Sequence, residues 1–102
     1  MRIPGSVKTL VSYVFYDSRL STFYLEEGIN SIFDFCFQNV AGLNNRVYLP
    51  NSCIDGVDVY AFYNLGTRNI GLVVKSEEMK QKLINKGLKG VTGSSITVQN
   101  WN

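Results

Sequence analysis

The residues that most often carry out acid–base and nucleophilic chemistry are sparse in this chain. It contains no histidine, which removes the commonest general base and the usual catalytic triads. Its acidic residues are scattered, and the adjacent Glu26 and Glu27 would face opposite sides of a strand. Cys36 and Cys53 have no neighbouring Cys or His with which to bind a metal, and we interpret them as small apolar fillers. We therefore expect no catalytic residue, no metal site and no cofactor.

Nucleic-acid binding is the less favoured of two binding hypotheses. Five lysines surround a helix predicted near the C-terminus: Lys75, Lys80, Lys82, Lys86 and Lys89. Tyrosine-rich strands are also suited to stacking on bases. However, the net charge is only +2, whereas a chain built to hold a phosphate backbone is usually more basic. We favour a solvated helix face as the interpretation of these lysines.

Repeated aromatic residues support the favoured hypothesis. Residues 13–17 (YVFYD) return as residues 60–64 (YAFYN), 47 positions later. If both segments are strands, Tyr16 and Tyr63 face away from the adjacent Phe side chains. Two interpretations stay open: these tyrosines line a groove for a partner, or they lie in the core with their hydroxyls at the surface.

Phe35 adds a further aromatic side chain, on the face of a predicted helix opposite most of its apolar stripe. An exposed aromatic beside other apolar surface is typical of a partner or self-association site. We expect a non-enzymatic module that binds a protein or an extended peptide through five aromatic residues: Tyr13, Tyr16, Phe35, Tyr60 and Tyr63. The identity of the partner and homo-oligomerisation stay open.

Two further matches extend the repeat along the chain. Residues 3–7 resemble residues 49–53 at an offset of 46, and residues 40–42 resemble residues 91–93 at an offset of 51. Growing offsets are typical of a duplication with small insertions. We predict a single domain made of two similar units, at about 1–48 and 49–102.

Each unit reads as strand, strand, helix, strand, which predicts an α+β fold with pseudo-two-fold symmetry. The strands are expected at 9–16, 20–26 and 46–49, and again at 57–63, 69–75 and 96–100. Polar residues at 17–19 and 64–68 favour hairpins. The seam between the two units would accept an extended segment as an added strand.

The two helices are expected at 30–40 and 76–87. The second has a Ser76 N-cap and a Gly87 that can end it in a left-handed conformation. The first is ambiguous, because residues 33, 35 and 37 are all Phe and alternate like a strand, whereas a wider apolar stripe is helical. The repeat favours a helix with Asn30 as its cap.

Neither a signal peptide nor a membrane span is indicated by the sequence, so we expect a soluble intracellular protein. The short length, the lack of histidine and the abundance of Tyr and Asn resemble small uncharacterised proteins of crenarchaeal filamentous viruses. That resemblance implies a viral protein of the host cytoplasm or the virion, with no assigned activity. It would also accommodate a disulfide between Cys36 and Cys53, since such bonds occur inside hyperthermophiles.

Overall fold

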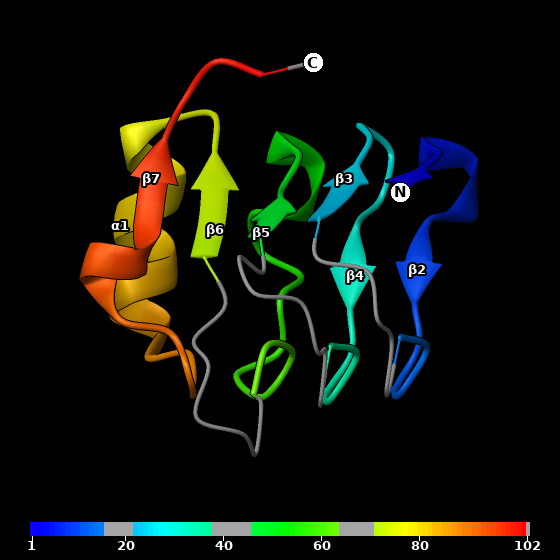
Figure 1. Ribbon diagram of the computed structural model, residues 1–102, viewed down its shortest axis with the longest axis horizontal. Helices are drawn as coiled ribbons and strands as arrows, with labels where there is room; N and C mark the ends of the chain where they lie inside the picture. The colour runs from blue at the N-terminus through cyan, green and yellow to red at the C-terminus, as the bar shows by residue number, and fades with distance from the viewer. Residues whose placement is uncertain (16–21, 38–45, 64–70, 102) are drawn as a thin grey trace.

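Parallel strands stacked along one axis define the architecture. The computed structural model describes residues 1–15, 22–37, 46–63 and 71–101. Five strands form sheet A in the spatial order β1, β3, β5, β6 and β7, and each neighbouring pair is parallel. Their bounds are β1 (Arg2–Ile3), β3 (Thr22–Leu25), β5 (Arg46–Tyr48), β6 (Gly71–Val74) and β7 (Ile96–Val98). Figure 1 shows β3, β5, β6 and β7 side by side along the long axis of the molecule.

The register of sheet A is nearly constant. Arg2 pairs with Tyr24, Tyr24 pairs with Tyr48, and Tyr48 pairs with Val73, so partners lie 22 to 25 residues apart in the sequence. A chain that returns to the same sheet after each such interval is a solenoid, in which every turn contacts only its neighbours. We call the repeating units of this solenoid coils 1 to 4, beginning at β1, β3, β5 and β6 in that order.

A second row of short strands lies across the core from sheet A. Strands β2 (Thr9–Leu10) and β4 (Ser31–Ile32) are parallel, and Ile32 also bridges Val57 of coil 3. The 3-10 turns η1 (Gly5–Val7) and η2 (Asn51–Cys53) connect the two rows in coils 1 and 3. Neighbouring coils come so close here that a Cβ added at Gly56 would lie 1.9 Å from the Asn30 carbonyl oxygen.

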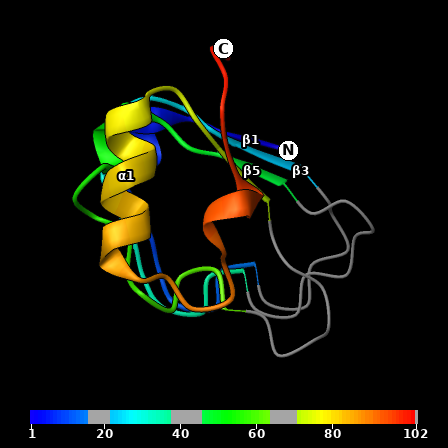
Figure 2. The ribbon, with the colours of Figure 1, turned by 90° about the vertical axis from the view of Figure 1, so that its left-hand side faces the viewer.

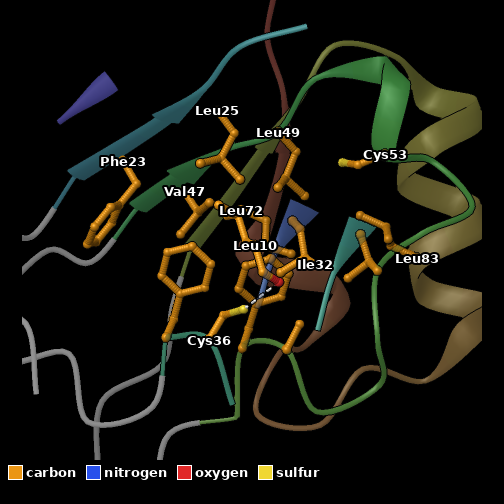
Figure 3. Packing of buried hydrophobic residues seen from close by; sticks show 14 of the residues in the cluster. Leu10, Phe23, Leu25, Ile32, Cys36, Val47, Leu49, Cys53, Leu72 and Leu83 are labelled. Carbon is orange, nitrogen blue, oxygen red and sulfur yellow. Dashed lines mark hydrogen bonds between the residues drawn. The ribbon is translucent and has the colours of Figure 1, made fainter. Parts of the chain in front are cut away.

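The core fills the space between the two rows. Leu25, Leu49 and Leu72 project from sheet A or its end towards Leu10 and Ile32, and all five are buried (Figure 3). Burying an aliphatic side chain of this size contributes about 1.5–3 kcal/mol. The alternating inward positions of each coil therefore hold the stack together.

One end of the stack is closed by α1 (Glu77–Lys86), which packs against β6 and β7 (Figure 2). The helix begins as predicted, because the Ser76 side chain accepts a hydrogen bond from the Met79 N–H at 3.2 Å. It ends at Gly87, whose φ of 74° is left-handed. Met79 and Leu83 are buried against the strands, while η3 (Gly93–Ser95) leads into β7.

The other end of the stack has no described element over it. Val7 and Val14 of coil 1 are exposed, although Ile29 and Cys36, 22 residues further on in coil 2, are fully buried. The same positions are thus apolar in both coils, and only the presence of a neighbouring coil decides whether water reaches them.

The predicted duplication of a strand, strand, helix, strand unit is wrong. Helix α1 is the single α-helix of the described residues, and the segment predicted as the first helix instead begins with β4 and continues into a turn at 34–37. The offset of 47 is the sum of two coils, because Leu10 pairs with Ile32 and Ile32 bridges Val57. Parallel stacking replaces the predicted two-fold symmetry.

The strand predictions were better in sheet A than in the second row. Strands β3, β5, β6 and β7 all lie inside the ranges predicted for them. In contrast, the range 9–16 begins with the two-residue β2, and 57–63 contains only the bridge at Val57 before a turn. The predicted hairpin turns at 17–19 and 64–68 fall outside the described residues. Strand β2 nonetheless pairs with β4, not with the strand that follows it.

Candidate interaction surface

Three stacked turns follow the second row of strands, at residues 12–15, 34–37 and 59–62. Their backbones are hydrogen bonded from coil to coil. The Phe15 N–H donates to the Cys36 carbonyl and the Phe35 N–H donates to the Tyr60 carbonyl, both at 2.9 Å. The Phe37 N–H likewise donates to the Ala61 carbonyl at 3.3 Å. Equivalent side chains of the three turns are therefore held one above the next.

An inner row of aromatic rings results from this stacking. Phe15, Phe37 and Phe62 lie with ring centroids 5.3 Å apart at each step. Phe23 of sheet A joins the row, 4.8 Å from Phe15 and 5.1 Å from Phe37. Phe37 and Phe62 are fully buried, so the inner row is part of the core.

An outer row lies two residues earlier in each turn. The Tyr13 and Phe35 rings are 5.5 Å apart, and the Phe35 and Tyr60 rings are 5.6 Å apart. Tyr63 completes the group, 5.9 Å from Tyr60 and 6.3 Å from Phe35. Tyr13 is 53% exposed and Tyr60 is 42% exposed, whereas Phe35 is half-buried between them. These four residues form a continuous aromatic surface, which we call the outer row.

The backbone beneath the outer row is unusual. Tyr13 has a φ of 63° and Phe35 has a φ of 57°, which is a left-handed conformation that bulky residues rarely adopt. Such a residue costs about 1–3 kcal/mol and persists only where the surrounding structure holds it. The third turn differs, because Tyr60 does not have a positive φ and its N–H donates to the Asp58 side chain at 2.9 Å. Two turns are therefore strained where the aromatic ring is presented.

The sequence family agrees with the solenoid. Residues 1–87 match the family described as "BspA type Leucine rich repeat region (6 copies)". The chain belongs to this family. No curated protein and no solved structure matches the chain. Leucine-rich repeats stack into surfaces that bind other proteins, so membership of this family indicates a protein–protein interaction module.

In this leucine-rich repeat chain, the repeated apolar positions are only partly leucine. Leu10, Ile32 and Val57 occupy one such position and are all buried. Equivalent positions of successive coils are apolar but are not occupied by the same residue. Identical residues therefore reveal only every second coil, since coils 1 and 3 share Tyr, Phe and Pro.

Carboxylates border the outer row of the leucine-rich repeat. The Ser12 hydroxyl donates to Asp34, and Asp58 accepts from the Tyr60 backbone. The pKa of Cys36 is raised to about 12, chiefly by burial and in smaller part by the negative charges of Asp34 and Asp58. Both carboxylates therefore lie within electrostatic reach of the turns, which gives the aromatic surface a negative border.

Neither cysteine has the properties of a nucleophile. Cys36 and Cys53 are free and buried, so the disulfide that the viral resemblance would accommodate is not formed. Burial raises the pKa of each thiol to about 12, which leaves both protonated at neutral pH. Within the described ranges, no three His, Cys, Asp or Glu side chains are grouped so as to hold a metal ion.

The structure unites most of the predicted partner-binding residues, but not as predicted. Tyr13, Phe35, Tyr60 and Tyr63 form the outer row, and Tyr16 lies outside the described residues. The two symmetric halves that were predicted to form a groove are not found, because the described coils stack in parallel. Phe35 lies in a turn and not on a helix, so it comes to the surface for a different reason from the one expected.

The predicted basic face is partly neutralised. Lys75 lies 3.3 Å from a Glu27 carboxylate oxygen, and Lys82 lies 3.4 Å from an Asp55 carboxylate oxygen. Burial alone would raise the pKa of Glu27, but hydrogen bonds from the Asn51 backbone, Lys75 and the Ser52 backbone lower it. Nucleic-acid binding through Lys75, Lys80, Lys82, Lys86 and Lys89 stays a prediction.

No helix in the described part of the chain has the length and apolar character needed to cross a bilayer.

Proposed function

We propose that this leucine-rich repeat domain binds an extended segment of a partner protein along the outer row, without catalysing a reaction. The observation that carries the proposal is the row itself: exposed Tyr13 and Tyr60 flank Phe35 on turns that are fixed by backbone hydrogen bonds. Rigid aromatic residues supply much of the binding energy at protein interfaces, because little side-chain freedom is lost when they are covered.

The spacing of the rings suits an extended chain. Consecutive rings of the outer row are 5.5 and 5.6 Å apart. Side chains on one face of an extended peptide recur about every 6.6–6.8 Å. A peptide running from coil to coil would therefore bring one side chain near each ring, and the negative border of Asp34 and Asp58 favours Lys or Arg beside its apolar residues.

The proposal is tested by selecting binders from a random peptide library displayed on phage. The whole chain is the target, and the selected peptides are then measured against a variant with Tyr13→Ser, Phe35→Ser and Tyr60→Ser. We expect peptides with aromatic and basic residues whose affinity falls at least about tenfold in the variant, since loss of one interface anchor costs about 2 kcal/mol.

A matched control keeps the test specific to the outer row. Val7→Ser and Val98→Ser remove exposed apolar side chains elsewhere, at 45% and 40% exposure, and should leave the selected peptides bound. Equal loss of affinity in both variants would show that general surface apolarity carries the binding. Failure to select any peptide with a Kd below about 1 mM would contradict the proposal directly.

A further inference from the structure

The outward face of sheet A holds a second set of aromatic residues, separate from the outer row. Side chains alternate across a strand, so Phe23, Val47 and Leu72 point into the core while Tyr24, Tyr48 and Val73 point outward. Outward residues are normally accessible to water. Val73, however, is only 1% exposed although it is not part of the main core cluster. The outward face is therefore shielded from water at this point.

The C-terminal segment of the same chain lies on this face, against Tyr48, the partner of Val73 in the sheet. After β7 the chain turns back across the end of β6 (Figure 1), where the Gln99 N–H donates to the Val74 carbonyl at 2.9 Å. The ring of Trp101 then lies 5.5 Å from Tyr48, edge to face, and 6.0 Å from Tyr24. Trp101 is 6% exposed and, like Val73, is buried outside the main core cluster.

The surface under Trp101 is organised to receive an aromatic ring. Tyr24 and Tyr48 stack with centroids 4.4 Å apart, and the Lys75 Nζ lies 4.6 Å from the centroid of Trp101. Glu27 holds Lys75 in place through an ion pair of 3.3 Å. A ring docked here meets Tyr48 in an edge-to-face arrangement and lies under an ammonium group, and a cation over the ring favours an electron-rich aromatic.

Two features distinguish the segment from an ordinary part of the core. Gln99 and Asn100, which lead to Trp101, are exposed, so a single side chain provides the buried contact. In addition, the Trp101 Nε1 is buried with no hydrogen-bond acceptor among the described residues. A buried donor without a partner costs free energy that a better-matched ligand would not lose.

We propose that the outward face of sheet A is a second binding surface, closed in cis by residues 99–101, and that its partner is an extended segment carrying an aromatic side chain. The partner ring takes the place of Trp101 between Tyr48 and Lys75. Its backbone takes the place of Gln99 at the Val74 carbonyl. Because the site already holds an aromatic ring on an extended chain, the chemistry of the partner follows from that of the segment it displaces.

Tethering explains why the surface is closed in the isolated chain. A ligand joined by a short linker acts at an effective concentration on the order of millimolar. A free peptide with the same contacts must therefore reach millimolar concentration to compete. Removing the segment should open the surface without altering the strands beneath it.

The test uses a chain that ends at Val98 and a synthetic peptide of residues 98–102. Trp101 is the only tryptophan in the sequence, so the shortened chain contains none and the peptide fluorescence reports docking alone. We expect a saturable blue shift with the shortened chain and at least roughly tenfold weaker binding to the full chain, because its own segment competes. Tyr48→Ala in the shortened chain should abolish the shift. A peptide with Trp101→Ala should not compete.

Each remaining outcome would overturn the proposal. Equal binding to both chains would place the peptide elsewhere on the surface. A dimer of the full chain that is lost on shortening, measured by light scattering, would identify the occupant as the segment of a second copy. The full chain with Trp101→Ala keeps the backbone of the segment and is tested in parallel. If neither this variant nor the shortened chain unfolds cooperatively, the segment is part of the core.

Discussion

The inner and outer aromatic rows differ by two residues in each turn, yet they have opposite environments. Phe15, Phe37 and Phe62 are packed under sheet A, whereas Tyr13, Phe35 and Tyr60 lie along the surface. Both rows have nearly the same ring spacing because the same backbone hydrogen bonds set it. Ring stacking alone therefore does not distinguish a core row from a binding row.

Backbone conformation is what separates the two rows. In the first two turns, the outer residues Tyr13 and Phe35 have a left-handed φ, whereas the inner residues Phe15 and Phe37 do not. A strained backbone at Tyr13 and Phe35 costs stability, which supports the proposal that their rings contact a partner. The inner row stabilises the coils, and the outer row is the surface proposed to contact a partner.

The largest expected effect comes from Phe37→Ala in the inner row. Phe37 is fully buried and contacts the rings of Phe15, Phe23 and Phe62. Truncating such a ring leaves a cavity and should lower the free energy of unfolding by about 3–5 kcal/mol. Urea denaturation followed by circular dichroism measures the change. A loss similar to that of Phe35→Ala would remove the distinction between the rows.

Cys36, which lies between the two rows, should make stability fall at alkaline pH. Burial raises its pKa from 9.0 to about 12, so the folded state disfavours the thiolate. The stabilisation is complete below pH 9 and is lost as the pH rises from 9 towards 12, by up to about 1 kcal/mol per pH unit. Denaturation from pH 8 to 11 should show a shallower decline for Cys36→Ala. Ala61 already occupies the equivalent buried place in coil 3. An unchanged slope would mean that Cys36 is accessible as a thiolate in the folded chain.

A smaller effect should appear when Phe35 is replaced by Gly and by Ala. Glycine tolerates a φ of 57° without strain, so Phe35→Gly should be about 1 kcal/mol more stable than Phe35→Ala. At Phe37 the order should reverse, since its φ is not positive and glycine adds only flexibility to the unfolded chain. The four variants are compared by their unfolding midpoints. The same order at both positions would show that backbone strain does not separate the rows.

The smallest effect is expected for Tyr60→Phe in the outer row. Tyr60 is 42% exposed, and removing an exposed hydroxyl usually changes the free energy of unfolding by less than about 0.5 kcal/mol. Peptides selected on the natural chain should keep their affinity if the ring itself makes the contact. A selective loss of affinity without a loss of stability would assign the contact to the hydroxyl instead.

Local signals in the sequence predicted some elements well. The caps of α1, Ser76 and Gly87, act through neighbouring residues, and so they can be read without knowing the fold. Strands β3, β5, β6 and β7 were also located, since their apolar residues are bounded by polar ones. These are the elements in which local preference and the final structure agree.

The stacking was not predictable in the same way. Coil 2 has apolar residues at positions equivalent to those of its neighbours, but few of these residues are identical. The repeat between residues 13–17 and 60–64 therefore spans two coils, which doubles the apparent period. A helix was wrongly predicted at 30–40, because the spacing of apolar residues typical of a helix also occurs in a tight turn that packs on both sides. Four of the five aromatic residues predicted to bind a partner nevertheless lie together, because equivalent positions of successive coils are stacked.

The nearly constant register of sheet A has a consequence for how this chain folds and how it can change. Each strand pair closes a loop of only 22 to 25 residues, whatever the total length of the molecule. Assembly can therefore start at any adjacent pair and spread in either direction. Because Leu25 and Leu49 occupy the same place in successive coils, a copy of residues 25–48 inserted after residue 48 would continue the stack in frame. The stack can therefore be lengthened by whole coils without a change of fold.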